Sequence, residues 1–298
     1  MNDEAIAQAP ARLADVQTLC RRKLADTDLG SYYSLLFLSN DRRAATIPLY
    51  AFWLEVREVV DECTDPLVAQ TKLAWWHEEL QRAFAQQPRH PVTIALSPVI
   101  AAHQLPRQPF LDVLEELARR ATVARYASFD ELREHAIRTR GRIALLAAVV
   151  GGLEDSATAA YVTSIGAALE LTALLRDAGA DARRGRIYLP EDELRRFGVS
   201  ADEVHAGRGN EAFRAFMAFA VTQALDQLDH ASTQLPRGDR TRQLPLLIEV
   251  EIARALLAEI QHDNYRVLEH KLQLTPLRQL WIAWRTVWRE RRRATRDA

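Results

Sequence analysis

Residues that interrupt regular structure are scarce in this sequence. Its 298 residues include only 11 Gly and 12 Pro, together about 8% of the chain where an average protein has about 12%. Runs that alternate apolar and polar residues are missing, whereas apolar residues recur at three- and four-residue intervals along most of the chain. This spacing is typical of amphipathic helices. The sequence therefore predicts an all-α fold and argues against a β-rich one.

Charge of one sign, cysteine and long apolar runs are also in short supply. The net charge is −1, so no overall positive field would attract nucleic acid. The two cysteines, Cys20 and Cys63, cannot build a disulfide framework. The longest apolar run, residues 143–153, falls well short of the ~20 residues of a membrane-spanning helix. The first residues lack the basic and apolar parts of a signal peptide. We therefore predict a cytoplasmic protein with no nucleic-acid partner.

Helix start signals divide the chain into long helices joined by short breaks. Asp65-Pro66 and Thr275-Pro276 each place a capping residue before a proline at the first helical position. Residues 200–203, Ser-Ala-Asp-Glu, have the spacing of a capping box. The expected helices cover residues 42–63, 66–86, 91–104, 108–126, 129–150, 156–182, 209–234, 243–272 and 276–292.

Neither a low-complexity linker nor a repeat interrupts these helices, which predicts one domain over residues 1–298. The segment 141–152, GRIALLAAVVGG, has no polar residue after Arg142. A helix that is apolar on all sides belongs in the centre of a bundle, and a large bundle can enclose an apolar cavity.

A pair of carboxylates stands in residues 171–190, LTALLRDAGADARRGRIYLP. Asp177 and Asp181 are four residues apart, so both face the same side of a helix. Carboxylate oxygens, completed by water and substrate phosphates, are the ligands that Mg²⁺ prefers. The alternative is a solvated pair neutralised by the neighbouring arginines. Spacing alone favours this alternative, because such acidic pairs are common on surface helices.

A second acidic segment is EVREVVDE at residues 55–62. Glu58 shares a helix face with Asp61 or Glu62, and Arg57 stands one turn before Asp61, where it would form an ion pair within the helix. A helix with alternating charges usually faces water. Two acidic helix faces in one apolar bundle would nonetheless suit a metal-bound diphosphate that carries an apolar tail.

The segments 49–62, 73–80 and 171–190 together resemble the squalene/phytoene synthase family of head-to-head isoprenyl diphosphate synthases. The last is the most specific, because its RDxxxDxxRGRIYLP follows the second aspartate motif of the family. The resemblance is clearest over residues 30–200. It implies an all-α isoprenoid synthase fold, in which two Asp-rich helices hold Mg²⁺ and diphosphate at the mouth of a central apolar cavity.

Members of this family join two farnesyl or geranylgeranyl diphosphates, and squalene formation then uses NADPH. The resemblance implies a Mg²⁺-dependent prenyltransferase of isoprenoid biosynthesis, with an isoprenyl diphosphate or another isoprenoid lipid as its ligand. NADPH use is left open, because the sequence has no GxGxxG motif and family members bind NADPH without one.

The resemblance also implies which residues form the site. Four carboxylates would hold the metal: Asp61, Glu58, Asp177 and Asp181. Five residues would contact the diphosphate or the prenyl chain: Arg57, Arg176, Arg186, Ser31 and His135. Tyr50 would line the cavity or stabilise positive charge through its ring face. The expected catalytic residues are Asp61, Asp177, Asp181 and Tyr50.

Several positions depart from the family pattern. The first motif of the family is DxxxD preceded by an arginine, and here its first Asp falls on Arg57 and its arginine on Leu54. A guanidinium in place of a carboxylate opposes Mg²⁺ binding but can pair with phosphate oxygens. Further along, the substrate-contacting tyrosine of the family is replaced by His135, and Arg140 enters a region that should be apolar or small.

These departures leave two functions open. One is a working prenyltransferase with a divergent first motif, which the well-kept second motif favours. The other is a catalytically inactive family member that binds an isoprenoid or lipid, or that serves as an assembly factor.

The C-terminal segment 276–293 combines aromatic and basic residues. Trp281, Trp284 and Trp288 fall on one helix face, and five arginines follow or flank them. Such a helix suits a lipid interface, which would add membrane association to the cytoplasmic location. The favoured alternative is that the tryptophan face packs on the bundle and the arginine tail stays in solvent.

Overall fold

Helices make up nearly all regular structure in the computed structural model, which describes residues 3–123, 125–153 and 155–296, with side chains from Leu13 to Thr295. The helices of the first half are α1 Asp3–Thr27, α2 Leu29–Leu35, α3 Asn40–Glu62, α4 Pro66–Phe84, α5 Pro91–Ala102, α6 Gln108–Thr122, α7 Phe129–Ala136, the π-helical turn η1 Ile137–Gly141 and α8 Arg142–Val150. Those of the second half are α9 Ser156–Arg183, α10 Glu191–Arg196, α11 Ala201–His205, α12 Glu211–Gln234, α13 Arg237–Arg240, α14 Leu244–His262 and α15 Pro276–Arg296.

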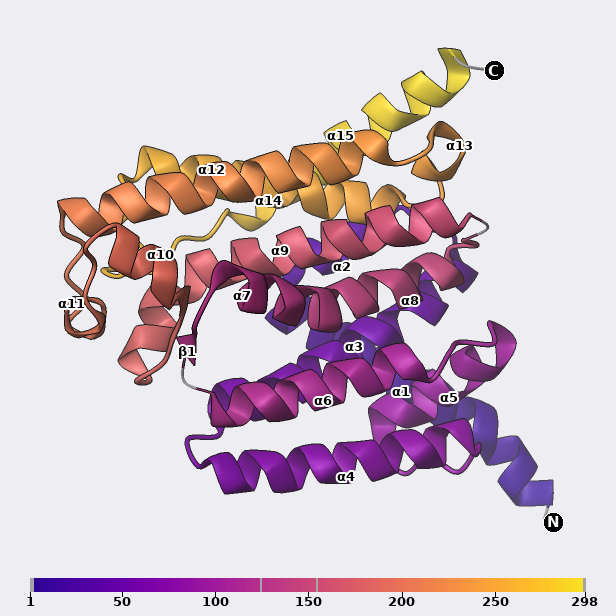
Figure 1. The fold of residues 1–298 in the computed structure, drawn as a ribbon. Coiled ribbons are helices and arrows are strands. Elements are labelled where there is room, and N and C mark those ends of the chain that lie inside the picture. Colours follow the sequence, from indigo (N-terminus) through magenta and orange to yellow (C-terminus); the bar gives the residue numbers. More distant parts are fainter. Residues whose placement is uncertain (1–2, 124, 154, 297–298) are drawn as a thin grey trace.

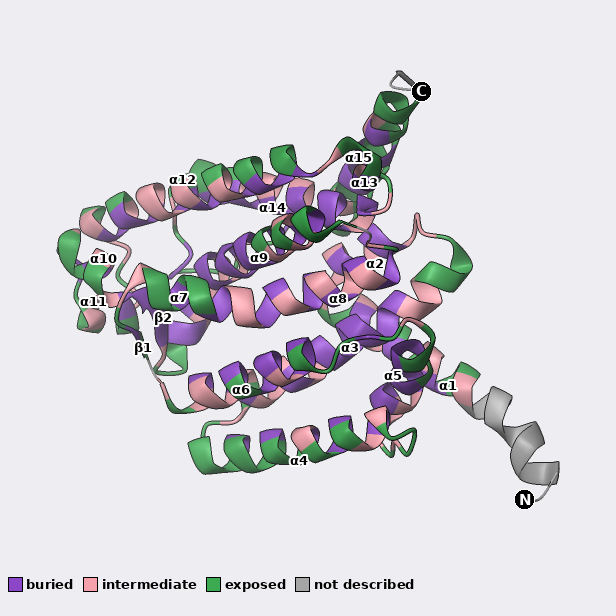
Figure 2. Ribbon diagram, turned by 45° about the vertical axis from the view of Figure 1, so that its right-hand side comes forward, coloured by how far each residue is buried: buried purple, intermediate pink, exposed green. Residues whose placement is uncertain are grey.

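Helix α9 lies in the middle of the bundle, between the helices of the first half and the α12–α14 pair (Figure 1). It is the one helix among the described residues that is long and apolar enough to cross a membrane. Most of its apolar stretch is buried inside the bundle, as expected for a core helix. Exposed residues concentrate on outer helices such as α4 and α12 (Figure 2).

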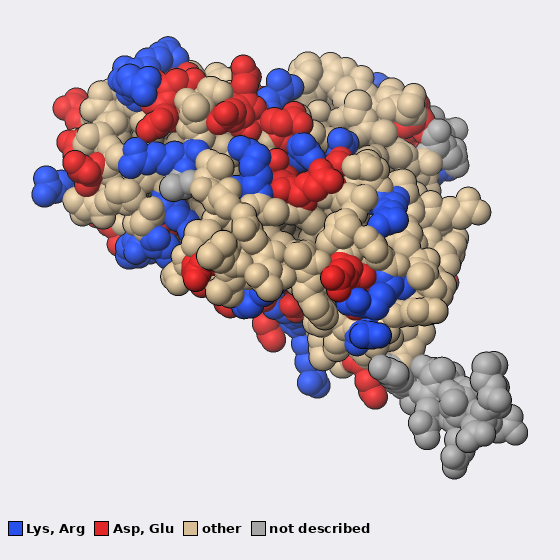
Figure 3. Space-filling model, turned by 60° about the horizontal axis from the view of Figure 1, so that its bottom comes forward, with Lys and Arg blue, Asp and Glu red and all other residues tan. Residues whose placement is uncertain are grey.

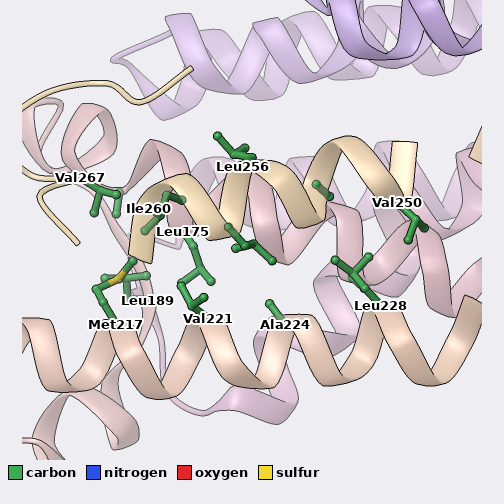
Figure 4. Close-up of a cluster of buried hydrophobic side chains, with 14 of the residues drawn as sticks. Leu175, Leu189, Met217, Val221, Ala224, Leu228, Val250, Leu256, Ile260 and Val267 are labelled. Carbon is green, nitrogen blue, oxygen red and sulfur yellow. The ribbon is translucent and has the colours of Figure 1, made fainter. Parts of the chain in front are cut away.

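Two large hydrophobic cores hold the bundle together. One joins α1, α3, α4, α5, α6 and α8, and its largest fully buried side chain is Trp53 on α3. The other joins α9, α12 and α14, where Leu228 on α12 and Val250 on α14 lie side by side and Leu256 points away from α12 (Figure 4). The space between α3, from the first core, and α9 and α14, from the second, is the place where a ligand cavity can form.

The helix expected over residues 129–150 contains a change of geometry at its centre. Residues 137–141 form the π-helical turn η1 between α7 and α8. A single π turn inside an α-helix often marks a functional site. Gly166 on α9 packs directly against this turn, since a Cβ there would lie 2.7 Å from the Arg140 carbonyl oxygen and 2.9 Å from the Gly141 Cα.

The helix expected over residues 243–272 ends ten residues early, at His262. Asn264 and Tyr265 both have positive φ angles, 56° and 59°, and this left-handed conformation terminates α-helices. The chain then runs without helix to Pro276. Similarly, the helix expected over 108–126 stops at Thr122, because Arg125–Tyr126 form strand β1, which pairs in parallel with strand β2, Ile187–Pro190.

Several local signals in the sequence are confirmed. The Asp65 side chain accepts a hydrogen bond from the backbone N–H of Leu67, with Pro66 at the first position of α4. Ser200 and Glu203 form the reciprocal hydrogen bonds of a capping box at the start of α11. Helices α1 and α2 were not among the predicted helices, and α2 is capped by Asp28, whose side chain accepts from the Ser31 N–H.

We predict that Gly166→Ala destabilises the protein. Its methyl group would meet the Arg140 carbonyl oxygen, the Gly141 Cα and the Ala144 Cβ, all closer than 3.0 Å, and overpacking of this kind costs about 1–3 kcal/mol. Thermal unfolding followed by circular dichroism measures the effect. Gly238→Ala is the control, because a Cβ there meets nothing within 4 Å. Equal melting temperatures for the two variants would contradict the close packing of α9 on η1.

Candidate functional site

A cavity of about 370 Å³ lies between α2, α3, α9 and α14. Part of its wall is apolar, with Leu169 and Ala173 from α9 and Ile252 and Leu256 from α14. The remainder is strongly charged, so the cavity is amphipathic rather than apolar throughout. Its charged lining residues are Asp28, Arg57, Glu58, Asp61, Glu62, Arg140, Glu170, Arg176, Asp177, Asp181, Arg184, Glu249 and Lys271.

Arg57 lies between the two acidic segments. Its Nε donates to Asp61 Oδ2 at 3.1 Å, and its Nη2 is 3.8 Å from Asp177 Oδ2. The pair with Asp61 is the intrahelical ion pair expected from their spacing on α3, whereas the contact with Asp177 joins α3 to α9. Burial disfavours the charge of Arg57, but the carboxylates of Glu170, Asp61 and Asp177 raise its pKa above the usual value. The guanidinium therefore stays charged in this position.

Asp177 has two further cationic neighbours. Arg176 donates to it through Nε at 2.9 Å and Nη2 at 2.5 Å, and Lys271 Nζ lies 3.9 Å from Oδ1. Lys271 belongs to the irregular segment after α14. This segment can lie close to α9 because Gly179 has no side chain, whereas a Cβ there would collide with the Val267 carbonyl oxygen. Burial raises the pKa of Asp177, but Arg176, Arg57 and Lys271 together hold it below the usual range.

Asp61 also forms an ion pair with Arg120 of α6. The guanidinium of Arg120 is fully buried, lies 3.1 Å from Asp61 Oδ1 through Nη2, and stacks 4.1 Å from the centre of the Tyr188 ring. Despite burial, Arg57 and Arg120 lower the pKa of Asp61. Both aspartates that face each other across the cavity are thus ionised and already paired with arginine.

Asp181 differs from the other two aspartates. It is 6% exposed, and among the described residues no ion pair or side-chain hydrogen bond involves its carboxylate. Burial, reinforced by the nearby charges of Asp61 and Asp177 and opposed by Arg120, raises its pKa to about 6. Glu170, about two turns before Asp177 on α9, likewise has a buried Oε1 without a hydrogen-bond partner.

A polar network forms the wall between α2, η1 and α14. Arg140 donates through Nη2 to Glu249 Oε2 at 2.6 Å and to Ser31 Oγ at 2.9 Å. The Tyr50 hydroxyl donates to Glu249 Oε1 at 2.8 Å, and the Arg140 guanidinium lies 5.3 Å from the centre of the Tyr50 ring. Arg140 and Glu249 are both buried, so each needs the other as a partner. The network puts fixed charge at Arg140, where the sequence resemblance predicts an apolar or small residue.

The structure brings some of the expected site residues together and separates others. Asp61, Asp177, Asp181, Arg57, Arg176, Glu58 and Ser31 line the cavity. Glu58 is already bound by Lys23 of α1. Arg186 donates to the backbone carbonyls of Val60 and Cys63, each at 2.5 Å, and so caps the end of α3.

The other two expected residues, His135 and Tyr50, are not among the residues that line this cavity. The His135 ring is fully buried, and its Nδ1 lies 2.9 Å from Glu116 Oε1. Burial lowers its pKa. Tyr50 stands behind the Arg140–Glu249 pair and reaches the cavity through that pair.

The residues present do not fit a divalent metal in this arrangement. Among the side chains that the structure describes, no group of three or more His, Cys, Asp or Glu is placed to hold one. The cations Arg57, Arg120, Arg176 and Lys271 equal in number the carboxylates Asp61, Asp177, Asp181 and Glu170, so the cluster is formally neutral. Mg²⁺ needs free carboxylate oxygens, and guanidinium groups hold those of Asp61 and Asp177.

Four residues that shape the site were not singled out from the sequence. Glu170 precedes Asp177 by seven residues, a spacing that places both on one helix face. Glu249 is a lone carboxylate in the apolar run 244–250, and such a charge signals a buried partner. Arg120 and Lys271 carry no comparable signal, because their partners belong to distant elements. On the face drawn in Figure 3, acidic and basic side chains likewise gather in mixed clusters rather than in a field of one sign.

The unpaired Asp181 generates a prediction on stability. An acid whose pKa is higher in the folded than in the unfolded chain loses stability as pH rises through the interval between the two values, here from about 4 to about 6. Above that interval the whole penalty is present. We expect Asp181→Asn to increase the free energy of unfolding at pH 8 by up to about 3 kcal/mol, with no gain below about pH 4.

Urea unfolding at the two pH values measures this difference, with Asp226→Asn on the exposed side of α12 as the control. A variant no more stable than the wild type at the higher pH would show that Asp181 has a counter-charge in solution.

Comparison with known proteins agrees with this architecture. The chain matches the squalene/phytoene synthase family over residues 24–278. It is 29% identical over 289 residues to the 15-cis-phytoene synthase of Synechococcus elongatus, with 92% of this chain and 93% of that one covered. The structure resembles a squalene synthase from Alicyclobacillus acidocaldarius with a TM-score of 0.74 at 27% identity, over 86% of this chain and 97% of the other.

A dehydrosqualene synthase has the same fold, with a TM-score of 0.81 at 19% identity over 93% of this chain and 97% of that one. These likenesses confirm the predicted all-α isoprenoid synthase fold. The family match also extends further along the chain than the segments that carry the resemblance in sequence. The chain belongs to the squalene/phytoene synthase family of head-to-head isoprenoid synthases.

Proposed function

We propose that the cavity binds one isoprenyl diphosphate through arginine and does not condense two of them. The observation that supports this proposal is the position of Arg57, which is paired with Asp61 and close to Asp177. A carboxylate at this position would help to bind a metal, whereas a guanidinium neutralises the two aspartates from within the site. The family fold is retained, but a positive charge stands at position 57, where the family resemblance implies a negative one.

The diphosphate would bind to guanidinium groups. Arg57 and Arg176 both contact Asp177, and Arg184 and Lys271 line the same cavity. Arginine pairs with two phosphate oxygens at once. An incoming diphosphate would therefore replace Asp177 as the partner of these cations.

The prenyl chain would lie against the apolar part of the wall, formed by Leu169, Ala173, Ile252 and Leu256. A volume of about 370 Å³ is near the lower end of the range for sites that hold a single small ligand. The buried ion pair between Arg140 and Glu249 occupies the wall in front of Tyr50, and burying a second hydrocarbon chain against fixed charge is unfavourable. One chain fits this site better than two.

Mg²⁺ and NADPH have no part in this proposed function, and a cytoplasmic location agrees with it. A second candidate is the prenyl transfer implied by the family, which is supported by Asp181. This buried carboxylate is unpaired among the described residues, and it belongs to the motif that matches the family best. Prenyl transfer would require Arg57 to leave Asp61 and Asp177 when the substrate binds.

Substitution of Asp177 distinguishes the two functions, because the expected effects have opposite signs. If Asp177 competes with the ligand for Arg57 and Arg176, Asp177→Asn should tighten the binding of farnesyl diphosphate about tenfold, with the same Kd in Mg²⁺ and in EDTA. Isothermal titration calorimetry measures the Kd, and Asp226→Asn is the control. If Asp177 is a metal ligand of a working enzyme, the variant should lose binding and turnover.

Turnover is measured on the same samples as diphosphate release from farnesyl and geranylgeranyl diphosphate, with lipid products identified by mass spectrometry. We expect no product from the wild type. A Mg²⁺-dependent product that disappears in Asp177→Asn would overturn the proposal and establish prenyl transfer.

Arg57→Asp tests whether Arg57 has replaced the metal. This change places carboxylates at positions 57 and 61 and leaves four aspartates around the mouth with one cation fewer, so the variant should unfold at a lower temperature than the wild type. Addition of Mg²⁺ should then raise its melting temperature, because a ligand that binds only the folded state stabilises it. Arg57→Met also removes the guanidinium but adds no carboxylate, and Mg²⁺ should leave it unchanged. A wild-type protein stabilised by Mg²⁺ as strongly as Arg57→Asp would argue against the replacement.

A further inference from the structure

Helix α15 carries an apolar face that nothing among the described residues covers. Leu277 is 80% exposed, Trp281 54%, Trp284 55% and Trp288 46%, and Leu280 is also exposed. The favoured expectation that these tryptophans pack on the bundle is therefore wrong. The physical reason is that the opposite face of α15 packs against the bundle. That face consists of the buried residues Ile282, Ala283, Thr286, Val287 and Glu290.

The packed face holds α15 firmly to the bundle. Ala283 and Val287 form a small hydrophobic cluster with Leu244 and Ile248 of α14, and Tyr33 and Phe37 of the α2 region pack against it. Glu290 is buried, and its carboxylate forms ion pairs with Arg240 Nε at 2.8 Å and with Arg293 Nη1 at 3.1 Å. The tryptophan face is thus presented on a fixed helix rather than on a loose tail, and its last turns project from the bundle near the C-terminus (Figure 1).

Positive charge borders the tryptophans without matching acids. Arg285, Arg291 and Arg292 are exposed, and none of the ion pairs seen between described residues involves them. Arg285 lies over the Trp281 ring at 4.8 Å and Arg292 over the Trp288 ring at 3.4 Å. Glu290 is the one acid within α15, and it faces the bundle. The exposed face of α15 therefore combines indole rings with arginine side chains and has no acidic residue of this helix on it.

We propose that the exposed face of α15 docks this protein onto a membrane surface that contains anionic phospholipid. Tryptophan is favoured at the level of the lipid headgroups because its ring is apolar and its N–H is polar. Arginines beside it are attracted by anionic headgroups. An amphipathic helix with this division lies in the plane of the interface, with its apolar face in the lipid.

Charge argues against a second copy of the chain as the occupant. A symmetric dimer through this face would bring the same patch of both copies together, so Arg285, Arg291 and Arg292 of each copy would meet those of the other. Like charges in contact oppose association. A bilayer with negative headgroups supplies the charge that the face lacks.

Vesicle flotation of the full-length protein tests this inference. We expect binding to vesicles of phosphatidylcholine with phosphatidylglycerol, weaker binding to phosphatidylcholine alone, and a decrease with added salt. The variant Arg285→Gln/Arg291→Gln/Arg292→Gln should lose roughly tenfold or more in partitioning to the anionic vesicles, and Trp281→Ser/Trp284→Ser should lose binding to both. Circular dichroism of each variant verifies that it is folded.

Trp75→Ser is the matched control, because Trp75 is also exposed, at 42%, but lies on α4. It should bind like the wild type. Equal binding of the arginine variant and the wild type would overturn the proposal. So would a dimer in light scattering that Trp281→Ser/Trp284→Ser converts to a monomer, in a protein that does not bind vesicles. Since the vesicles contain no isoprenoid, the outcome is independent of ligand binding in the cavity.

Discussion

The charge balance around Arg57 is the constraint on which the rest of the site depends. Four carboxylates converge between α3 and α9: those of Asp181 and Glu170 are buried, and those of Asp61 and Asp177 are partly buried. Carboxylates of like sign away from water are unfavourable unless cations lie among them. In this chain, arginine and lysine side chains supply these cations. Arg57 connects Asp61 and Asp177, and partners from α6 and from the segment after α14 complete the neutralisation. Because these partners come from four separate parts of the sequence, the ion pairs also hold together the two halves of the bundle at the place where its two hydrophobic cores are separated by a cavity.

Close contacts along α9 make this arrangement possible. Gly166 allows the π-helical turn to approach, and Gly179 allows the backbone near Val267 to approach. The first contact positions Arg140 opposite Glu249, and the second positions Lys271 opposite Asp177. Helix α9 therefore has two tasks. Its apolar residues fill the core. Its two glycines, Gly166 and Gly179, let the backbone segments that hold Arg140 and Lys271 pack closely against it.

Much of this could be predicted from the sequence, and the part that could not has a common cause. Helical periodicity, capping residues and the motif around Asp177 are local, so they indicate the all-α fold, the helix starts and one acidic face of the site. The pair between Arg57 and Asp61 follows from their spacing on one helix. The contact of Arg57 with Asp177 does not, because no spacing rule joins residues on helices far apart in sequence. The same limit applies to Lys271, whose position depends on the left-handed residues that end α14 ten residues early.

The π-helical turn has a consequence in terms of insertion and deletion. Such a turn holds one residue more than the α-helical turn it replaces, and each residue of an α-helix adds about 100° of rotation. Because the turn takes up its extra residue, deletion of one residue from 137–141 would restore a continuous α-helix and keep α7 and α8 in nearly their present orientation, whereas a deletion elsewhere in α8 would rotate the residues beyond it by that angle. The side chains of the turn itself would change direction, and Arg140 would lose its present alignment with Ser31 and Glu249. A single codon in this turn thus determines whether the wall of the cavity carries a buried ion pair.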